Sequence, residues 1–487
     1  MRSYPATPRL RTTVPSLFAF NEGELVDVEI GDLALGGSGV GKIHGFVILV
    51  RRAVPGDVVR VRITARKPNY AEAEIVENLG PSPLRVSPRC RLFEECGGCQ
   101  WMSLQYEHQL DAKERQVGEA LARIGGLSGF TLHPIIRSPE IYKYRNKLEL
   151  AFADGPGGLT LGFHQVGSET TVVDSRGCLI GSERMDEVAR AARDLLSEAG
   201  YQPAPWEGPS RDGDGRNERL VAKNGDKDLL RQLVLREGRR TGEMLVGLIT
   251  VDGPMPDEKG FAESLMTRFP FIVGVVRTVE GRRRGLRDGA ERILAGRGDL
   301  RESLGGITYE ISPSAFFQVN SEQAENLYAR TRELALDHGR DSVLDLYCGV
   351  GGLTLFLAAR ARRVTGVESS PEAVRCAIAG AARNRFGNVK FICGEARRIV
   401  KRLAAADRRY DVVVLNPPRS GIHEDMLGGV PSLSPRRIVY VSCNPATLAR
   451  DLSGLTARGY RLTDVQPMDM FPHSFHVETI ARLERSG

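Results

Sequence analysis

The chain has 487 residues, of which 41% are hydrophobic and 26% charged, and its formal net charge is +6. This length suits roughly three globular domains, no run approaches the ~18 apolar residues of a membrane span, and the first residues lack the apolar core of a secretory signal. We therefore expect a soluble cytoplasmic protein without a membrane partner, while the mildly basic charge alone does not establish nucleic-acid binding.

Residues 24–78 alternate in short strand-like pieces, separated by the turn signals GGSG, PGD and KPN. This spacing is typical of a small β-barrel. The glycine-rich GGSGVGK followed by FVILVRRAVPGDVV resembles the TRAM domain, an OB-like RNA-binding module. A barrel that serves only for packing is the alternative, but Arg51, Arg52, Arg66 and Lys67 favour an edge that faces phosphates. We place this domain at residues 20–80.

Three cysteines follow the barrel within ten residues, in the stretch RCRLFEECGGCQW: Cys90, Cys96 and Cys99. In a reducing compartment, such a cluster indicates a metal site or catalysis more often than a disulfide framework. A closed four-ligand metal site would need one more ligand from elsewhere in the chain.

Residues 81–318 are predicted to form a central mixed α+β domain. The stretch WMSLQYEHQLDAKERQVGEALARIGG predicts one helix that ends at glycines, and a second helix is predicted around 185–198. Strand-like pieces such as KYRNKLELAFA, RQLVLRE and EMLVGLITV surround the second helix.

Residues 319–487 alternate between buried strands and helical segments, which predicts a doubly wound α/β domain with a Rossmann-like sheet. Ligands in such sheets bind beyond the carboxyl ends of the strands. The residues that end each strand are therefore the candidate site residues.

The first strand of this domain ends in Asp345-Leu-Tyr-Cys-Gly-Val-Gly-Gly352, and the second ends at Glu368. A glycine turn lets a ligand approach the backbone, and an acidic residue about twenty positions on can bind ribose hydroxyls. A dinucleotide is one candidate ligand. The spacing C-G-V-G-G, without G-x-G-x-x-G, resembles instead the first motif of class I S-adenosylmethionine-dependent methyltransferases.

Two later strands end in Asn416-Pro-Pro-Arg-Ser-Gly and in Val-Ser-Cys443-Asn-Pro. Asn444 and Pro445 read as the cap and first turn of a helix, whose N-terminus would favour the Cys443 thiolate. Glu478 begins the last strand, which we expect to run antiparallel and to enter from the same rim. A carboxylate over an activated cysteine is a candidate general base.

These motifs, together with SPSAFFQVN and the terminal MFPHSFHVE, resemble over nearly the whole chain the TRAM-domain, iron–sulfur-containing RNA uracil-C5 methyltransferases that act on 23S ribosomal RNA. The resemblance implies Cys443 as the nucleophile that adds to uracil C6, and Glu478 as the base that removes the C5 proton. It implies RNA as the partner, with the target uridine in a loop or flipped out, and no obligate protein partner is evident. The implied contacts to S-adenosylmethionine are Gln318, Tyr347, Gly352, Glu368 and Asn416.

The same resemblance implies that Cys90, Cys96 and Cys99 join Cys178, in VVDSRGCLI, to hold a [4Fe-4S] cluster. Zinc with four cysteines is the physical competitor. The C-x5-C-x2-C spacing differs from the C-x3-C-x2-C of radical methylthiotransferases, which leave one iron open. With four thiolates, a structural or RNA-positioning role is expected.

Three alternatives remain open from the sequence. Asn416-Pro-Pro suggests an exocyclic-amine methyltransferase, because the asparagine carbonyl can accept from an amino group, but that chemistry leaves Cys443 and Glu478 idle. A transfer-RNA uracil-C5 methyltransferase and a non-catalytic RNA-binding protein are the others. Asn416 also departs from the family, whose turn begins with aspartate.

Overall fold

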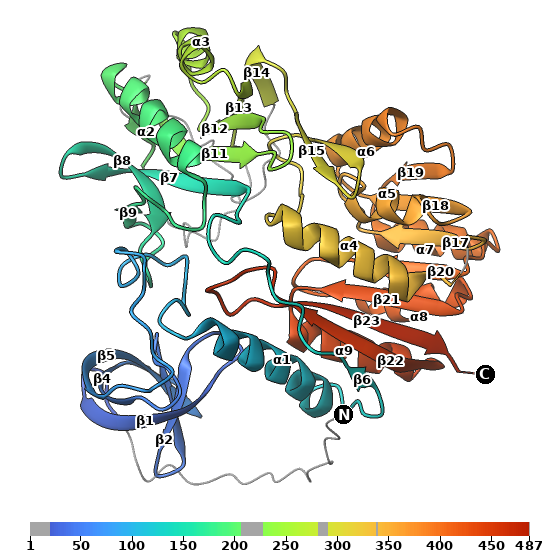
Figure 1. Cartoon of the computed structure of the whole chain (residues 1–487), viewed down its shortest axis with the longest axis horizontal. Helices are drawn as coiled ribbons and strands as arrows, with labels where there is room; N and C mark the ends of the chain where they lie inside the picture. Colours follow the sequence, from blue (N-terminus) through green and yellow to red (C-terminus); the bar gives the residue numbers. More distant parts are fainter. Residues whose placement is uncertain (1–19, 206–226, 281–290, 338, 487) are drawn as a thin grey trace, which may run out of the picture.

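The computed structural model describes residues 20–205, 227–280, 291–337 and 339–486. Figure 1 shows a small barrel at the N-terminal end, a mixed sheet above it, and a layered α/β unit that ends with the C-terminus. This arrangement confirms the predicted multidomain α/β class. The first 19 residues, in which we expected no targeting signal, lie outside the described residues.

The barrel confirms the predicted OB-like fold. Its strands close in the order β1-β2-β3-β5-β4. Along β4 the valines and isoleucine at 59, 61 and 63 are buried, while the residues between them face outward, as the two-residue period of a strand requires. The strands are β1 (Leu25–Leu33), β2 (Gly39–Ile43), β3 (Phe46–Val50), β4 (Val58–Arg66) and β5 (Tyr70–Gly80).

A second, mixed sheet follows, in the order β14-β13-β12-β11-β7-β8-β9, with β10 beside β11. The apolar face of α2 packs into its core, and every residue of β12 is buried. The elements are β7 (Lys147–Gly155), β8 (Gly158–His164), β9 (Val172–Asp174), α2 (Glu183–Glu198), β10 (Gln202–Pro203), β11 (Asp228–Glu237), β12 (Met244–Thr250), α3 (Glu258–Arg268), β13 (Ile272–Val279) and β14 (Glu291–Gly296). A hairpin of β15 (Leu300–Leu304) and β16 (Ile307–Ile311) leads to the last unit.

The third sheet confirms the doubly wound prediction. Its order is β19-β18-β17-β20-β21-β23-β22-β6, and β23 alone of the long strands runs antiparallel to its neighbours. The central β20, Val-Val-Val-Leu, is wholly buried because helices cover both faces of the sheet. The strands are β17 (Ser342–Leu346), β18 (Arg363–Glu368), β19 (Val389–Cys393), β20 (Val412–Leu415), β21 (Arg437–Ser442), β22 (Tyr460–Met468) and β23 (Glu478–Arg485).

The helices of this unit alternate with its strands, as the sequence predicted. They are α4 (Ser321–Ala335), α5 (Gly352–Ala358), α6 (Pro371–Arg383), α7 (Ala396–Ala405), α8 (Glu424–Ser432) and α9 (Pro445–Thr456). Pro371 and Pro445 stand in the first turns of their helices, where no backbone donor is needed.

Two elements from the range that we assigned to the central domain pack with this α/β unit instead. The long helix α1 (Tyr106–Arg123) packs against α9, and the short strand β6 (Thr131–Leu132) pairs with β22. Part of the region after the barrel therefore lies along the α9 and β22 side of the α/β unit, as Figure 1 shows. The domain boundaries at 80 and 318 remain predictions.

Among the described residues, no helix is long and apolar enough to cross a membrane.

Candidate active site

Two predicted catalytic residues lie at one rim of the third sheet. Strands β21 and β23 pair antiparallel with Ser442 opposite Thr479, so that Cys443, one residue beyond, lies beside Glu478 at the start of β23. The two side chains are close enough to interact electrostatically, since the Glu478 charge raises the pKa of Cys443. The sequence prediction that the last strand enters antiparallel from this rim is confirmed.

The helix after Cys443 begins as predicted, but the thiol is not activated at rest. Asn444 caps α9, since its side chain accepts from the Ala446 amide at 3.0 Å, and Pro445 occupies the first turn. Burial, and to a lesser extent the Glu478 carboxylate, nevertheless raise the pKa of Cys443 to about 11. Desolvation and the negative charge of Glu478 thus have a larger effect on the Cys443 pKa than the helix N-terminus has. Cys443 is a thiol at neutral pH.

The pKa of Glu478, which lies beside Cys443, is also shifted. Its side chain is buried, with 4% exposed, and burial raises its pKa to about 8. A buried carboxyl favours its neutral form because the low-dielectric surroundings penalise charge. A carboxylate whose pKa lies near neutrality is suited to take up a proton at the pH where it works.

Arg419, in the Pro-Pro-Arg-Ser-Gly turn, is a site residue that the sequence reasoning did not assign. Its carbonyl accepts from Asn444 Nδ2 and from Thr447 Oγ1, each at 3.1 Å, which fixes the turn to the start of α9. Its guanidinium lowers the pKa of both Cys443 and Glu478. The sequence signal that could have found it is its position within the Asn416-Pro-Pro-Arg-Ser-Gly motif, which follows a buried strand.

His476 contacts the side chain of Arg419. Its Nε2 is 3.3 Å from Arg419 Nη2, and burial, with that positive neighbour, lowers its pKa to about 4. The imidazole is therefore neutral at physiological pH and can accept from the guanidinium. This contact restrains the arginine between the two catalytic candidates.

The glycine loop after β17 has the backbone shape that a ligand approach requires. Tyr347 has φ +66°, and Gly351 has φ +80°, a left-handed conformation that glycine adopts without strain. A methyl group on Gly352 would stand 2.5 Å from the hydroxyl of Tyr328, so no other residue fits there without a shift. The Gly349 amide donates to Glu368 Oε2 at 3.0 Å, which brings the end of β18 to the loop.

Asp345, near the end of β17, has a buried carboxyl oxygen without a hydrogen-bond partner among the described residues. The residue is fully buried, and burial raises its pKa to about 7. Thr354 Oγ1 donates to its Oδ2 at 2.5 Å, whereas its Oδ1 has no hydrogen-bond partner among the described residues. Since buried polar atoms are almost always paired, an amine or hydroxyl of a bound ligand fits this place. The loop thus fits S-adenosylmethionine.

Of the other predicted cofactor contacts, Asn416 lies beside this loop, and Gln318 is buried against Asn146. The Asn416 amide donates to Leu346 O at 3.2 Å, so the half-buried Asn416 lies next to the strand end that leads into the glycine loop. Gln318 is buried, and its carbonyl accepts from Asn146 Nδ2 at 3.0 Å. Phe316, which we had not singled out, is 66% exposed, and its carbonyl lies 3.4 Å from where a side chain of Gly349 would begin.

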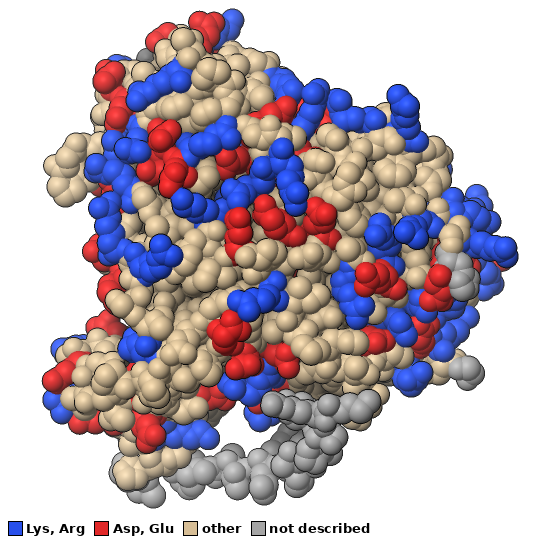
Figure 2. Space-filling model, viewed as in Figure 1, with Lys and Arg blue, Asp and Glu red and all other residues tan. Residues whose placement is uncertain are grey.

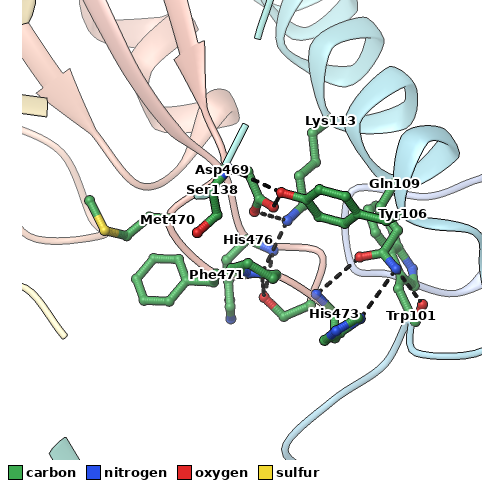
Figure 3. Close-up of polar contacts among 12 residues, drawn as sticks. Trp101, Tyr106, Gln109, Lys113, Ser138, Asp469, Met470, Phe471, His473 and His476 are labelled. Atoms are coloured by element: carbon green, nitrogen blue, oxygen red, sulfur yellow. Dashed lines mark hydrogen bonds and ion pairs between the residues drawn. The ribbon is translucent and has the colours of Figure 1, made fainter. Parts of the chain in front are cut away.

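The loop that connects β22 to Glu478 is anchored from two directions, and Figure 3 shows the contacts. Helix α1 supplies Lys113, which donates to Asp469 Oδ1 at 2.5 Å and to Phe471 O at 3.1 Å. From the cysteine segment, the amides of Gln100 and Trp101 donate to His473 O at 3.0 and 2.9 Å. The loop before Glu478 is thus held by segments more than 350 residues away in sequence.

The four predicted cysteine ligands share one neighbourhood. Burial raises the pKa of Cys99, and Cys178, Cys96 and Cys90 raise it further, in that order. All four are free and none is fully exposed. No three His, Cys, Asp or Glu side chains of the described part of the chain are arranged to hold one metal ion, and the metal centre stays a prediction.

Comparison with protein families gives two matches. A family described as tRNA (Uracil-5-)-methyltransferase matches residues 299–486, which contain the glycine loop, Cys443 and Glu478. The TRAM domain family matches residues 19–76, which contain β1 to β4 and most of β5 of the barrel.

Individual proteins match over almost the full length. An uncharacterized RNA methyltransferase of Bacillus cereus is 36% identical over 465 residues, which are 95% of this chain and 97% of the relative. One from Thermosynechococcus vestitus is 37% identical over 470 residues, which are 96% of this chain and 99% of the relative. The crystal structure of Pyrococcus abyssi tRNA (uracil-54, C5)-methyltransferase in complex with S-adenosyl-L-homocysteine is 28% identical with a TM-score of 0.71, and the match covers 94% of this chain and 100% of that one.

Proposed function

The chain belongs to the RNA uracil-C5 methyltransferases with an N-terminal TRAM domain, and we propose that it methylates a uridine through a covalent bond between Cys443 and C6 of the base. S-adenosylmethionine is the methyl donor of this family. The observation that carries the proposal is the meeting of Cys443 and Glu478 at one strand edge, with Arg419 acting on the pKa of both.

The chemistry follows from what uracil lacks, since C5 is a poor nucleophile. The Cys443 thiol gives up its proton to solvent, and the resulting thiolate adds to C6 and turns C5 into an enolate-like carbon. When bound, S-adenosylmethionine would supply the methyl group from its sulfonium: C5 would form the new bond to carbon as the S–CH3 bond breaks and a neutral thioether leaves. The Glu478 carboxylate then takes the C5 proton, the C5–C6 double bond reforms, and the Cys443 thiolate leaves.

The charges around Cys443 and Glu478 affect the protonation state of both groups in the free protein. Cys443 is a thiol in the free protein, because burial and Glu478 oppose its ionisation. Arg419 favours the thiolate and also favours the Glu478 carboxylate, so its charge supports both active forms. We assign to Arg419 the role of an electrostatic partner of the two catalytic groups.

We propose that five residues line the pocket for the methyl donor and the target uracil: Gln318, Tyr347, Gly352, Glu368 and Asn416. The unpartnered Oδ1 of Asp345 supports a ligand at this loop. Asn416 can accept from uracil N3–H and donate to O4, whereas an ionised aspartate can only accept. Asparagine at this position is therefore compatible with a uracil target.

We propose that Cys90, Cys96, Cys99 and Cys178 hold a [4Fe-4S] cluster. Each cysteine would bind a different iron, so the site does not require three side chains to converge on one ion, as zinc would. The mutual effects on the Cys99 pKa support one shared site. The contacts of Gln100 and Trp101 with His473 support a role in positioning the loop before Glu478.

For the RNA, our first candidate is a uridine of 23S ribosomal RNA, on the resemblance of the cysteine run and the terminal motifs. A transfer RNA is the second candidate, favoured by the 28% identical Pyrococcus abyssi enzyme that acts on uracil 54 of tRNA. Methylation of ribosomal and transfer RNA from a strain that lacks this protein, followed by mapping of 5-methyluridine, separates the two.

The mechanism is tested with RNA that contains 5-fluorouridine at the target. Wild-type protein should form a denaturation-resistant adduct, because fluorine cannot be removed as a proton, and Cys443→Ala should form none. Glu478→Gln should trap ordinary RNA, since addition and methyl transfer precede proton removal. Cys348→Ala is the matched control, because Cys348 is buried beside the glycine loop.

Methylation by Cys443→Ala, or its loss in Cys348→Ala alone, would show that the nucleophile is wrong. A product of N6-methyladenosine or N4-methylcytidine would favour the exocyclic-amine reaction.

A further inference from the structure

The edge of the third sheet that lies opposite the catalytic rim is basic. The loops that lead into the amino ends of β17, β18, β19 and β20 and the first residues of those strands carry exposed cationic side chains. Six of them have no carboxylate within ion-pair distance among the described residues: Arg340, Arg360, Arg363, Arg385, Lys390 and Arg408. Figure 2 shows blue side chains gathered on the right-hand side, where Figure 1 places β17 and α7.

The carboxylates of these same loops are already engaged. Asp337 pairs with Arg436 and Arg437, and Asp341 pairs with Arg436. Asp407 pairs with Arg409. Asp411 accepts from the backbone amide and hydroxyl of Ser342, each at 2.7 Å. The positive charge of the six is thus not neutralised locally, although a typical surface intersperses both signs.

The loops form one continuous surface because they are bonded to one another. Asn388 Nδ2 donates to the carbonyls of Ala358 and Ala361 at 2.9 and 3.0 Å, which joins the loops before β19 and β18. The Arg362 amide donates to Asp341 O at 3.0 Å, which joins the loop before β17. Neighbouring strands lie about 4.8 Å apart, so the cations form a compact group on a rigid edge.

We propose that this edge is a second RNA-binding surface, which contacts the phosphate backbone away from the methylated uridine. Strand β18 begins at Arg363 and ends at Glu368, which separates the edge from the cofactor loop by roughly 16 Å. A structured RNA that places its target at the catalytic rim can follow the side of the sheet over that length. Arginine and lysine contacts to phosphate carry affinity without reading sequence. The inference depends on the proposed function only in taking RNA as the substrate.

The test compares two variants that each remove three positive charges. Arg360→Gln/Arg363→Gln/Lys390→Gln neutralises the edge, and Arg190→Gln/Lys259→Gln/Arg268→Gln neutralises exposed positions on α2 and α3 as the control. Binding of a labelled RNA hairpin is followed by fluorescence anisotropy between about 50 and 200 mM salt, without methyl donor. Melting temperatures verify that both variants are folded.

The edge variant should bind the hairpin more weakly, and the slope of log affinity against log salt should fall by about two, since each lost phosphate contact removes roughly 0.7–0.9. The control should retain the wild-type slope. Equal slopes and affinities for the two variants would overturn the proposal. Because the assay requires no methyl transfer, an error in the catalytic assignment would not change its outcome.

Discussion

Lys113 and Asp469 form an ion pair that is closed to solvent on both sides. Lys113 Nζ lies 2.5 Å from Asp469 Oδ1, and neither side chain is exposed. The Tyr106 hydroxyl donates to the other carboxylate oxygen at 2.7 Å, as Figure 3 shows, so both oxygens are satisfied. Burial lowers the pKa of Lys113, and the carboxylate opposes that shift. Helix α1 is thereby fixed to the loop that leads into Glu478.

Removal of one member of this pair should destabilise the protein strongly. Lys113→Met leaves the Asp469 carboxylate buried without its counter-ion, which costs about 3–5 kcal/mol. Lys113→Met/Asp469→Asn should recover much of the loss, because the asparagine oxygen still accepts from Tyr106. Chemical denaturation measures the three free energies of unfolding.

The exposed pair of Lys143 and Glu183, at 2.6 Å, is the matched control for this experiment. Lys143→Met should leave the denaturation midpoint unchanged, because water solvates both partners. If Lys113→Met and Lys143→Met behave alike, the buried pair does not anchor the loop.

Glu478 should make stability depend on pH. Its pKa is about 8 in the folded protein, against 4.5 for the ordinary group, so the folded state keeps a proton that the unfolded state has lost between these values. Its contribution to stability is therefore present below about pH 4.5 and declines as the pH rises to 8. Glu478→Gln should gain stability relative to wild type across this window, by up to about 1.4 kcal/mol per pH unit. A pH-independent difference in unfolding free energy would contradict the raised pKa.

Catalysis should show the reverse trend. We propose Glu478 as the proton acceptor, so turnover should rise through an inflection near pH 8 as its carboxyl ionises, and rise further toward pH 11 as the Cys443 thiol ionises. Arg419→Gln should move this inflection to higher pH, because the guanidinium lowers the pKa of Glu478. The pH profile of kcat/KM, measured with methyl-labelled donor, tests both statements, because it reports the ionisation of groups in the free enzyme. An inflection that stays in place in Arg419→Gln would exclude the electrostatic role.

Asn416→Asp should reduce activity by no more than about tenfold, which corresponds to ~1.4 kcal/mol. The substitution keeps the shape of the side chain and loses the amide donor to uracil O4. Steady-state methylation of the mapped RNA measures the ratio. A loss of several orders of magnitude would mean that the amide donor is essential to uracil recognition.

Protein purified without oxygen should be brown and contain about four irons per chain. Cys96→Ser should lose the colour and lower the melting temperature, since the segment that follows bonds to His473 O through Gln100 and Trp101. Cys393→Ser, at an exposed cysteine, should change neither. Colourless protein with one zinc would refute the cluster.

Local sequence patterns are sufficient to predict several secondary-structure features of this protein. The alternation in the barrel strands, the glycine loop after a buried strand, and the cap formed by Asn444 and Pro445 each depend on neighbours within a few residues. Such features follow from backbone geometry and strand period, which the sequence carries directly. The placement of Cys443 beside Glu478 followed as well, because strand order in a doubly wound sheet restricts which ends meet.

The protonation states were decided only by the tertiary structure. A helix N-terminus predicted an activated Cys443, but burial and the nearby Glu478 raise its pKa to about 11. The sequence also could not reveal that Lys113 meets Asp469 across 356 positions, or that the Arg419 guanidinium acts on the pKa of both Cys443 and Glu478. Desolvation and Coulomb interactions depend on which atoms are close in space, and long-range packing alone sets those distances.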